Sequence, residues 1–130
     1  MTIHIQTIPH EQQRYPTVGD YWEEPGGVEQ VRISELSDWR YEALVTVHEL
    51  IEWFLTKHRA IAEQAISDFD IAFEQDKELG VVLGEAGDDP RAPYRREHFF
   101  ATNVERLLAA ELDVDWGAYE TLVDGLGIKK

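Results

Sequence analysis

The chain has 130 residues, no cysteine, and 26 acidic against 12 Lys and Arg side chains, which leaves a formal charge of −14. This length predicts one domain over residues 1–130, and the lack of cysteine excludes a disulfide framework, a thiolate zinc site and a cysteine nucleophile. The charge argues against nucleic-acid binding through a basic patch, and no apolar run approaches the roughly 20 residues of a membrane span, so we expect a cytoplasmic protein.

The N-terminal part of the chain has the patterns of β-strands. Apolar and polar residues alternate over residues 2–8, which predicts a short, half-buried strand. Two β-rich runs, 17–23 and 28–33, then flank a Pro-Gly-Gly turn, and this arrangement is typical of a hairpin. We therefore expect a small N-terminal antiparallel sheet.

The rest of the chain has helical patterns. Helices are predicted at about 38–58, 61–78 and 94–112, with a glycine- and proline-containing loop over 80–93. Ser37 or Asp38 is expected to cap the first helix, and Asp115 to cap a short last one. The predicted fold class is thus α+β, in which three to four helices pack against the small sheet.

Helical spacing also predicts which side chains face the core. On the first helix the expected core positions are Leu44, Val47, Ile51, Phe54 and Leu55. On the third they are Phe100, Ala101, Val104, Leu107 and Leu108. Trp53 points away from the first of these stripes, so it requires either a second core contact or a binding partner.

The most informative segment is Val45 to Trp53, which contains His48, Glu49 and Glu52. His48 and Glu52 are four residues apart, so they project from one side of a helix and could bind one divalent ion together. Glu49 is turned about 100° around the helix from His48, where a carboxylate could take a proton from a metal-bound water.

The run from His48 to Glu52 resembles the His-Glu-x-x-His signature of the zincin metallopeptidases. The resemblance implies that His48 is a zinc ligand and that Glu49 is the general base. It departs from the signature at Glu52, which stands where the family has its second histidine. The chain is also similar to small uncharacterised proteins of bacteriophages, a likeness that implies no site residues.

Further ligands have to come from another element, and His98 is the best candidate. On the predicted third helix His98 and Glu105 lie on one ridge beside the apolar stripe, so helix packing could bring His98 to His48. Glu105 would then be a fourth ligand or would orient an imidazole. His58 lies about 15 Å along the helix from His48, too far to share an ion. The expected metal is zinc or a similar divalent ion.

Two alternatives stay open. Glu49 and Glu52 could bind magnesium with Asp68, Asp70 or Glu74 of the next helix, and their Glu-x-x-Glu spacing resembles that of the all-helical nucleotide pyrophosphohydrolases. The other alternative is an acidic, non-enzymatic interaction module with an exposed aromatic anchor such as Trp53 for a basic partner. In that case the histidines and glutamates would form ordinary salt bridges.

Overall fold

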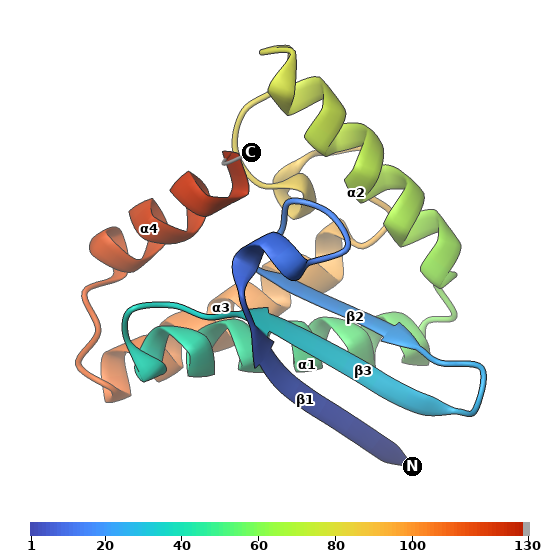
Figure 1. Cartoon of the computed structure of the whole chain (residues 1–130), viewed down its shortest axis with the longest axis horizontal. Helices are drawn as coiled ribbons and strands as arrows, with labels where there is room; N and C mark the ends of the chain where they lie inside the picture. The colour runs from blue at the N-terminus through green and yellow to red at the C-terminus, as the bar shows by residue number, and fades with distance from the viewer. Residues whose placement is uncertain (129–130) are drawn as a thin grey trace.

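In a computed structural model, which describes residues 1–128, the chain forms a three-stranded sheet followed by four α-helices (Figure 1). The strands are β1 (Thr2–Ile8), β2 (Gly19–Glu23) and β3 (Val28–Ser34). The α-helices are α1 (Trp39–His58), α2 (Glu63–Glu78), α3 (Arg95–Glu111) and α4 (Trp116–Ile128). Two short 3₁₀ helices are η1 (His10–Gln12) and η2 (Ala86–Asp88). The predicted α+β class is confirmed.

The sheet is mixed, so the expectation of a purely antiparallel sheet was wrong for one strand. β2 and β3 form the predicted antiparallel hairpin, but β1 pairs in parallel with the other edge of β3, and the strand order is β1-β3-β2. β1 ends and β2 begins at the same end of the sheet. Residues 9–18 therefore connect β1 to β2 across the end of β3. As a result β1 runs antiparallel to β2, but the two strands do not pair because β3 lies between them.

Local signals at the helix ends agree with the structure. The Asp38 carboxylate accepts a hydrogen bond from the backbone N–H of Arg40 at 2.9 Å, and Asp115 accepts one from Ala118 at 2.9 Å. Each bond satisfies a backbone donor in the first turn that has no partner within the helix. Asp38 and Asp115 are therefore the caps of α1 and α4, as the sequence predicts.

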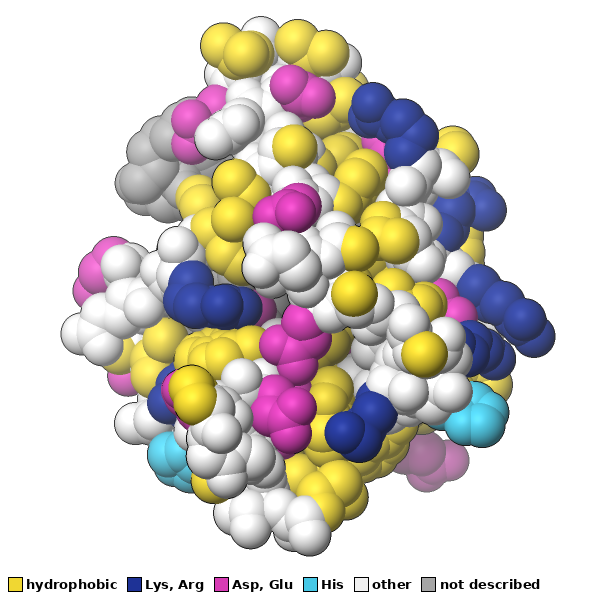
Figure 2. Space-filling view, turned by 90° about the vertical axis from the view of Figure 1, so that its right-hand side faces the viewer, with side chains coloured by type: hydrophobic (Ala, Val, Ile, Leu, Met, Phe, Trp, Pro, Cys, Tyr) yellow, Lys and Arg dark blue, Asp and Glu magenta, His cyan; other side chains and the backbone are white. Residues whose placement is uncertain are grey.

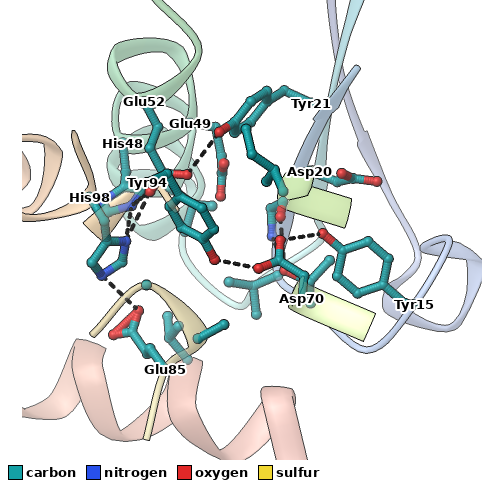
Figure 3. A pocket seen from close by; sticks show the side chains of 18 of the residues that line it. Tyr15, Asp20, Tyr21, His48, Glu49, Glu52, Asp70, Glu85, Tyr94 and His98 are labelled. Atoms are coloured by element: carbon teal, nitrogen blue, oxygen red, sulfur yellow. Dashed lines mark hydrogen bonds and ion pairs between the residues drawn. The ribbon is translucent and has the colours of Figure 1, made fainter. Parts of the chain in front are cut away.

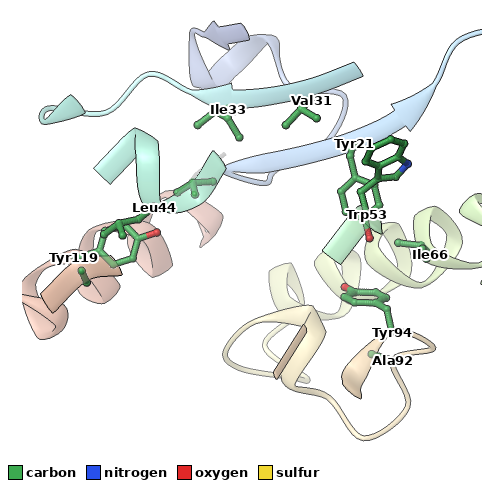
Figure 4. Close-up of a cluster of buried hydrophobic side chains, with 11 residues drawn as sticks. Tyr21, Val31, Ile33, Leu44, Trp53, Ile66, Ala92, Tyr94 and Tyr119 are labelled. Carbon is green, nitrogen blue, oxygen red and sulfur yellow. The ribbon is translucent and has the colours of Figure 1, made fainter. Parts of the chain in front are cut away.

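The hydrophobic core lies between the sheet and the helices (Figure 4). Val31 and Ile33 on β3 are fully buried, and they belong to one cluster with Leu44 and Trp53 of α1. Trp53 is only 4% exposed and belongs to this core, so of the two expectations for it the core contact is the one observed, and it is not an exposed anchor for a partner. α1 lies against the sheet and also packs along α3.

The predicted core stripes were partly wrong, because Phe54, Phe100 and Leu107 are 44%, 54% and 70% exposed. The buried residues of α1 are Leu44, Val45, His48, Glu52, Trp53 and Thr56. Those of α3 are Glu97, His98, Ala101, Glu105 and Ala109. α1 is enclosed by both the sheet and α3, so apolar periodicity does not identify a single inner face. Some of the buried positions on α1 are polar residues, and these form hydrogen bonds with other parts of the fold.

Figure 2 shows one face of the surface, on which acidic and apolar side chains occupy the middle and Lys and Arg lie mainly toward the margins. Among the described residues, no helix has the length and apolar character that crossing a membrane requires.

Candidate metal centre

A cavity of about 130 Å³ lies between α1, α2, α3 and the sheet, and η2 closes part of it (Figure 3). His48, Glu49 and Glu52 enter its wall from α1, and His98 enters from α3. His48, Glu52 and His98 are 8%, 5% and 5% exposed. Three polar side chains are therefore buried together at one end of the cavity.

His48, Glu52 and His98, here called the triad, converge on one point. His48 Nε2 lies 2.8 Å from Glu52 Oε2 and 3.1 Å from His98 Nδ1, and His98 Nδ1 lies 2.9 Å from Glu52 Oε2. Ligand atoms around a tetrahedral zinc ion with bonds of about 2.1 Å are ~3.4 Å apart. The triad would have to open by only about 0.5 Å per edge to hold such an ion, and the ion would keep a position free for another ligand.

In each imidazole, the outer nitrogen, which points away from the centre of the triad, contacts a carboxylate. His48 Nδ1 lies 2.7 Å from Glu105 Oε1, and Glu105 Oε2 accepts a 2.5 Å hydrogen bond from the Tyr119 hydroxyl. His98 Nε2 lies 3.3 Å from Asp88 Oδ1. When each outer nitrogen carries the proton, the inner nitrogens His48 Nε2 and His98 Nδ1 present lone pairs to one point. Carboxylates in this position orient metal-binding histidines and raise their basicity.

Glu52 is held in the same way. Its Oε2 atom faces both imidazoles, and its Oε1 atom accepts a 3.1 Å hydrogen bond from the Tyr21 hydroxyl on β2. Tyr21 therefore connects strand β2 to Glu52 on α1. All three triad side chains are thus held in position by contacts within the fold, and such preorganised side chains could hold a metal ion.

Two glycines allow the chain to approach the centre closely. A Cβ atom at Gly87 would overlap the imidazole ring of His98, and one at Gly19 would overlap the carboxyl group of Glu49. Neither glycine has a positive φ, so space rather than backbone conformation requires them. Gly87 lets η2 lie directly on His98, which also brings Asp88 to its outer nitrogen.

Protons hold the triad together in the metal-free protein. Burial opposes charge on His98, but hydrogen bonds with Asp88 and Glu52 outweigh it and raise the pKa of His98 to about 10. Burial likewise opposes charge on His48, while hydrogen bonds with Glu105 and Glu52 raise its pKa well above the ordinary value. Burial also acts against the Glu52 anion, but the two imidazoles lower its pKa to about 2. Two imidazolium protons thus occupy the place that a divalent cation would take.

Glu49 lines the cavity next to the triad, and Figure 3 shows its carboxyl group on the cavity side of α1. No hydrogen bond from another residue in the described range 1–128 reaches this group. Burial, followed by the charge of Glu52, raises the pKa of Glu49 well above the ordinary value. Glu49 is therefore a half-buried carboxyl group in the cavity wall whose protonated form is favoured by its surroundings.

Asp70 of α2 faces the cavity from the opposite wall. It accepts one hydrogen bond from the Tyr15 hydroxyl at 2.9 Å and another from the Tyr94 hydroxyl. Burial raises the pKa of Asp70 to about 7, against the opposing effect of these two hydrogen bonds. Tyr94 spans the cavity, because its ring also lies edge-on to His98, with ring centroids 6.3 Å apart.

The structure thus brings together some of the residues predicted from sequence and separates others. His48, Glu52 and His98 meet, whereas Glu105 lies behind His48 rather than beside Glu52. His58 is exposed at the end of α1. Within residues 1–128, the ligand atoms that come within 4.8 Å of one another do not include the set Glu49, Glu52 and Asp70 that the magnesium alternative requires.

Sequence reasoning assigned no contact with the triad to Tyr21, Gly87, Asp88 or Tyr119. Asp88 belongs to an Asp-Asp pair in the loop before α3, which was the only signal for it. The three other residues act through contacts between distant segments.

In comparisons with known proteins, no family model, no curated protein and no solved structure matches this chain. Neither the zincin resemblance nor the bacteriophage resemblance therefore gains support beyond the residues that suggested it. The buried group of His48, Glu52 and His98 could hold a metal ion.

Proposed function

We propose that this protein binds one zinc ion, or a similar divalent ion, at the triad and acts as a metal-dependent hydrolase. The observation that carries the proposal is the convergence of three ligand atoms, all within 3.1 Å of one another, in a buried cavity. Two imidazole nitrogens and one carboxylate oxygen form a donor set that zinc accepts, and this set is typical of catalytic rather than closed structural zinc sites.

The carboxylates behind the histidines support the same function. A histidine pair that served packing alone would need one partner for each ring, but here both nitrogens of each ring have polar partners. Glu105 and Asp88 each accept an outer N–H, so each inner nitrogen can bind metal without a change of ring orientation. The open side of the triad faces a cavity, where a water molecule and a substrate group can lie.

Glu49 is the residue that we assign as general base. A metal at the triad would acidify a water molecule in the cavity, and Glu49 would take its proton. Burial raises the pKa of Glu49, and this favours uptake of a proton by its carboxylate. The absence of hydrogen bonds from other described residues leaves its oxygens available for that water.

The test combines a spectroscopic and a catalytic measurement. Cobalt(II) replaces zinc at many such sites, and its visible absorption reports coordination by nitrogen and oxygen ligands. We expect one cobalt per chain with a four- or five-coordinate spectrum, and hydrolysis of at least one ester or amide in a panel of small substrates. The Glu49→Gln variant should keep the cobalt spectrum and lose hydrolysis. Cobalt that stays fully aquated, or hydrolysis that survives in Glu49→Gln, would contradict the proposal.

A further inference from the structure

The cavity that holds the triad is strongly acidic. Of the described residues that line it, nine are Asp or Glu and one, Lys77, is a permanent cation. The Lys77 ammonium donates to the backbone carbonyl of Gly84 at 2.7 Å, at the outer loop. A phosphate or carboxylate group would meet repulsion in this cavity, whereas a cation would be attracted.

Several of these carboxylates already have charged partners within the fold. Asp20 forms a 2.7 Å ion pair with Arg14, Glu52 contacts both imidazoles of the triad, and Glu105 contacts His48. Asp70 and Glu49 differ from them. The partners of Asp70 are two phenolic hydroxyls, and no hydrogen bond from the described residues reaches Glu49.

The region around Asp70 also has the chemistry that recognises an ammonium group. Each Asp70 oxygen accepts one hydroxyl, which leaves lone pairs for further donors, and the rings of Tyr15, Tyr21 and Tyr94 line the same cavity. Carboxylates beside aromatic faces bind ammonium groups through charge, hydrogen bonds and cation–π attraction. Figure 3 shows the Asp70 carboxyl group across the cavity from the triad, with Tyr94 between the two ends.

We infer that the substrate carries a protonated primary amine, which binds at Asp70 while the bond to be hydrolysed lies at the triad. This inference rests on the proposed hydrolase function, whose substrate class it names. The cavity of about 130 Å³ sets the size of the amine-bearing group. An apolar protein cavity of ~150 Å³ holds benzene, so a chain of four to six heavy atoms, such as the end of a lysine side chain, fits this space.

The test measures binding of n-butylammonium chloride to the zinc-loaded protein at pH 7.5 by calorimetry. n-Butanol and sodium butyrate serve as neutral and anionic ligands of the same length. We expect n-butylammonium to bind at least tenfold more tightly than n-butanol, and butyrate to show no binding. Equal binding of the alcohol and the amine would overturn the inference.

Two variants separate recognition by Asp70 from direct coordination of the amine to zinc. Asp70→Asn should keep one zinc per chain and lose the preference for the amine. Asp68→Asn, the matched control, removes the same charge from the exposed side of α2, where Asp68 accepts a 2.7 Å hydrogen bond from Gln64, and should keep the preference. An unchanged preference in Asp70→Asn would refute the amine site.

The outcomes also distinguish this inference from the proposed function. Zinc binding without any preference for the amine would refute the inference alone. A preference for the amine in a protein that binds no zinc would refute the hydrolase function and would support Asp70 as an amine site.

Discussion

Zinc binding to the triad should release two protons, and its affinity should therefore rise steeply with pH. In the metal-free protein the pKa of His98 is about 10 and that of His48 is raised well above its ordinary value, so both imidazoles are protonated near neutrality. Glu52, with a pKa of about 2, is already ionised. Zinc needs the lone pairs of both inner nitrogens, so its binding displaces a proton from each. For each proton displaced, the zinc affinity rises tenfold per unit increase in pH.

The expected magnitude is large. Between pH 6 and pH 7 two released protons should tighten zinc binding by about 100-fold, or ~2.7 kcal/mol. Calorimetry in buffers of different ionisation enthalpy counts the protons directly, because the observed heat changes in proportion to the number released. The outer protons of His48 and His98 stay on the rings, since Glu105 and Asp88 accept them.

A matched pair of variants tests the origin of these protons. His58 lies on the same helix as His48 but is exposed at its end, so His58→Ala should release two protons as the wild type does. His98→Ala should release fewer and bind zinc more weakly. Proton release below one per zinc in the wild type, or an affinity that does not change between pH 6 and pH 7, would refute the assignment of the ligand atoms.

Three further predictions concern residues around the triad. Gly87→Ala should lower zinc affinity at least tenfold, because its Cβ would displace the His98 ring, whereas Gly26→Ala meets open space and should have no effect in the same zinc titration. Glu49→Gln should lower the rate of hydrolysis at least 100-fold without changing zinc affinity, and a loss of both would argue that Glu49 is a ligand. Asp70→Asn should stabilise the metal-free protein above pH 7 by up to ~4 kcal/mol relative to wild type. The pKa of Asp70 is about 7 in the folded protein and about 4 in the unfolded chain, so the wild type loses stability as pH rises between these values, and the variant does not. Chemical denaturation at pH 4 and pH 8 would show this difference growing with pH, and an equal difference at both values would contradict it.

Local patterns were enough to predict the secondary structure and part of the site. The Pro-Gly-Gly turn identified the β2–β3 hairpin, and Asp38 and Asp115 marked the starts of two helices. The spacing of His48 and Glu52 placed both on one side of α1, since a helix returns to the same face after four residues. These features depend on neighbours in the sequence, which a single chain displays directly.

Features that depend on distant segments could not be predicted. β1 pairs in parallel with β3 because of the path that the chain takes across the end of the sheet. No residue within β1 indicates whether the strand pairs in parallel or antiparallel. The inner face of α1 was misjudged because the helix has neighbours on several sides, so Phe54 looks as suitable for the core as Trp53. Glu105 was placed on the correct ridge of α3, but only the packing of α3 on α1 shows that it meets the outer nitrogen of His48.

The metal content of the purified protein tests the central claim most directly. Wild type, His48→Ala and His58→Ala should be prepared without chelator and without a nickel column, and zinc, manganese, iron and magnesium should be measured per chain. We predict about one zinc, or one similar divalent ion, in wild type and in His58→Ala, and none in His48→Ala. Equal metal content in wild type and His48→Ala, or no metal in wild type even after incubation with zinc, would contradict the assignment of a metal centre to His48, Glu52 and His98.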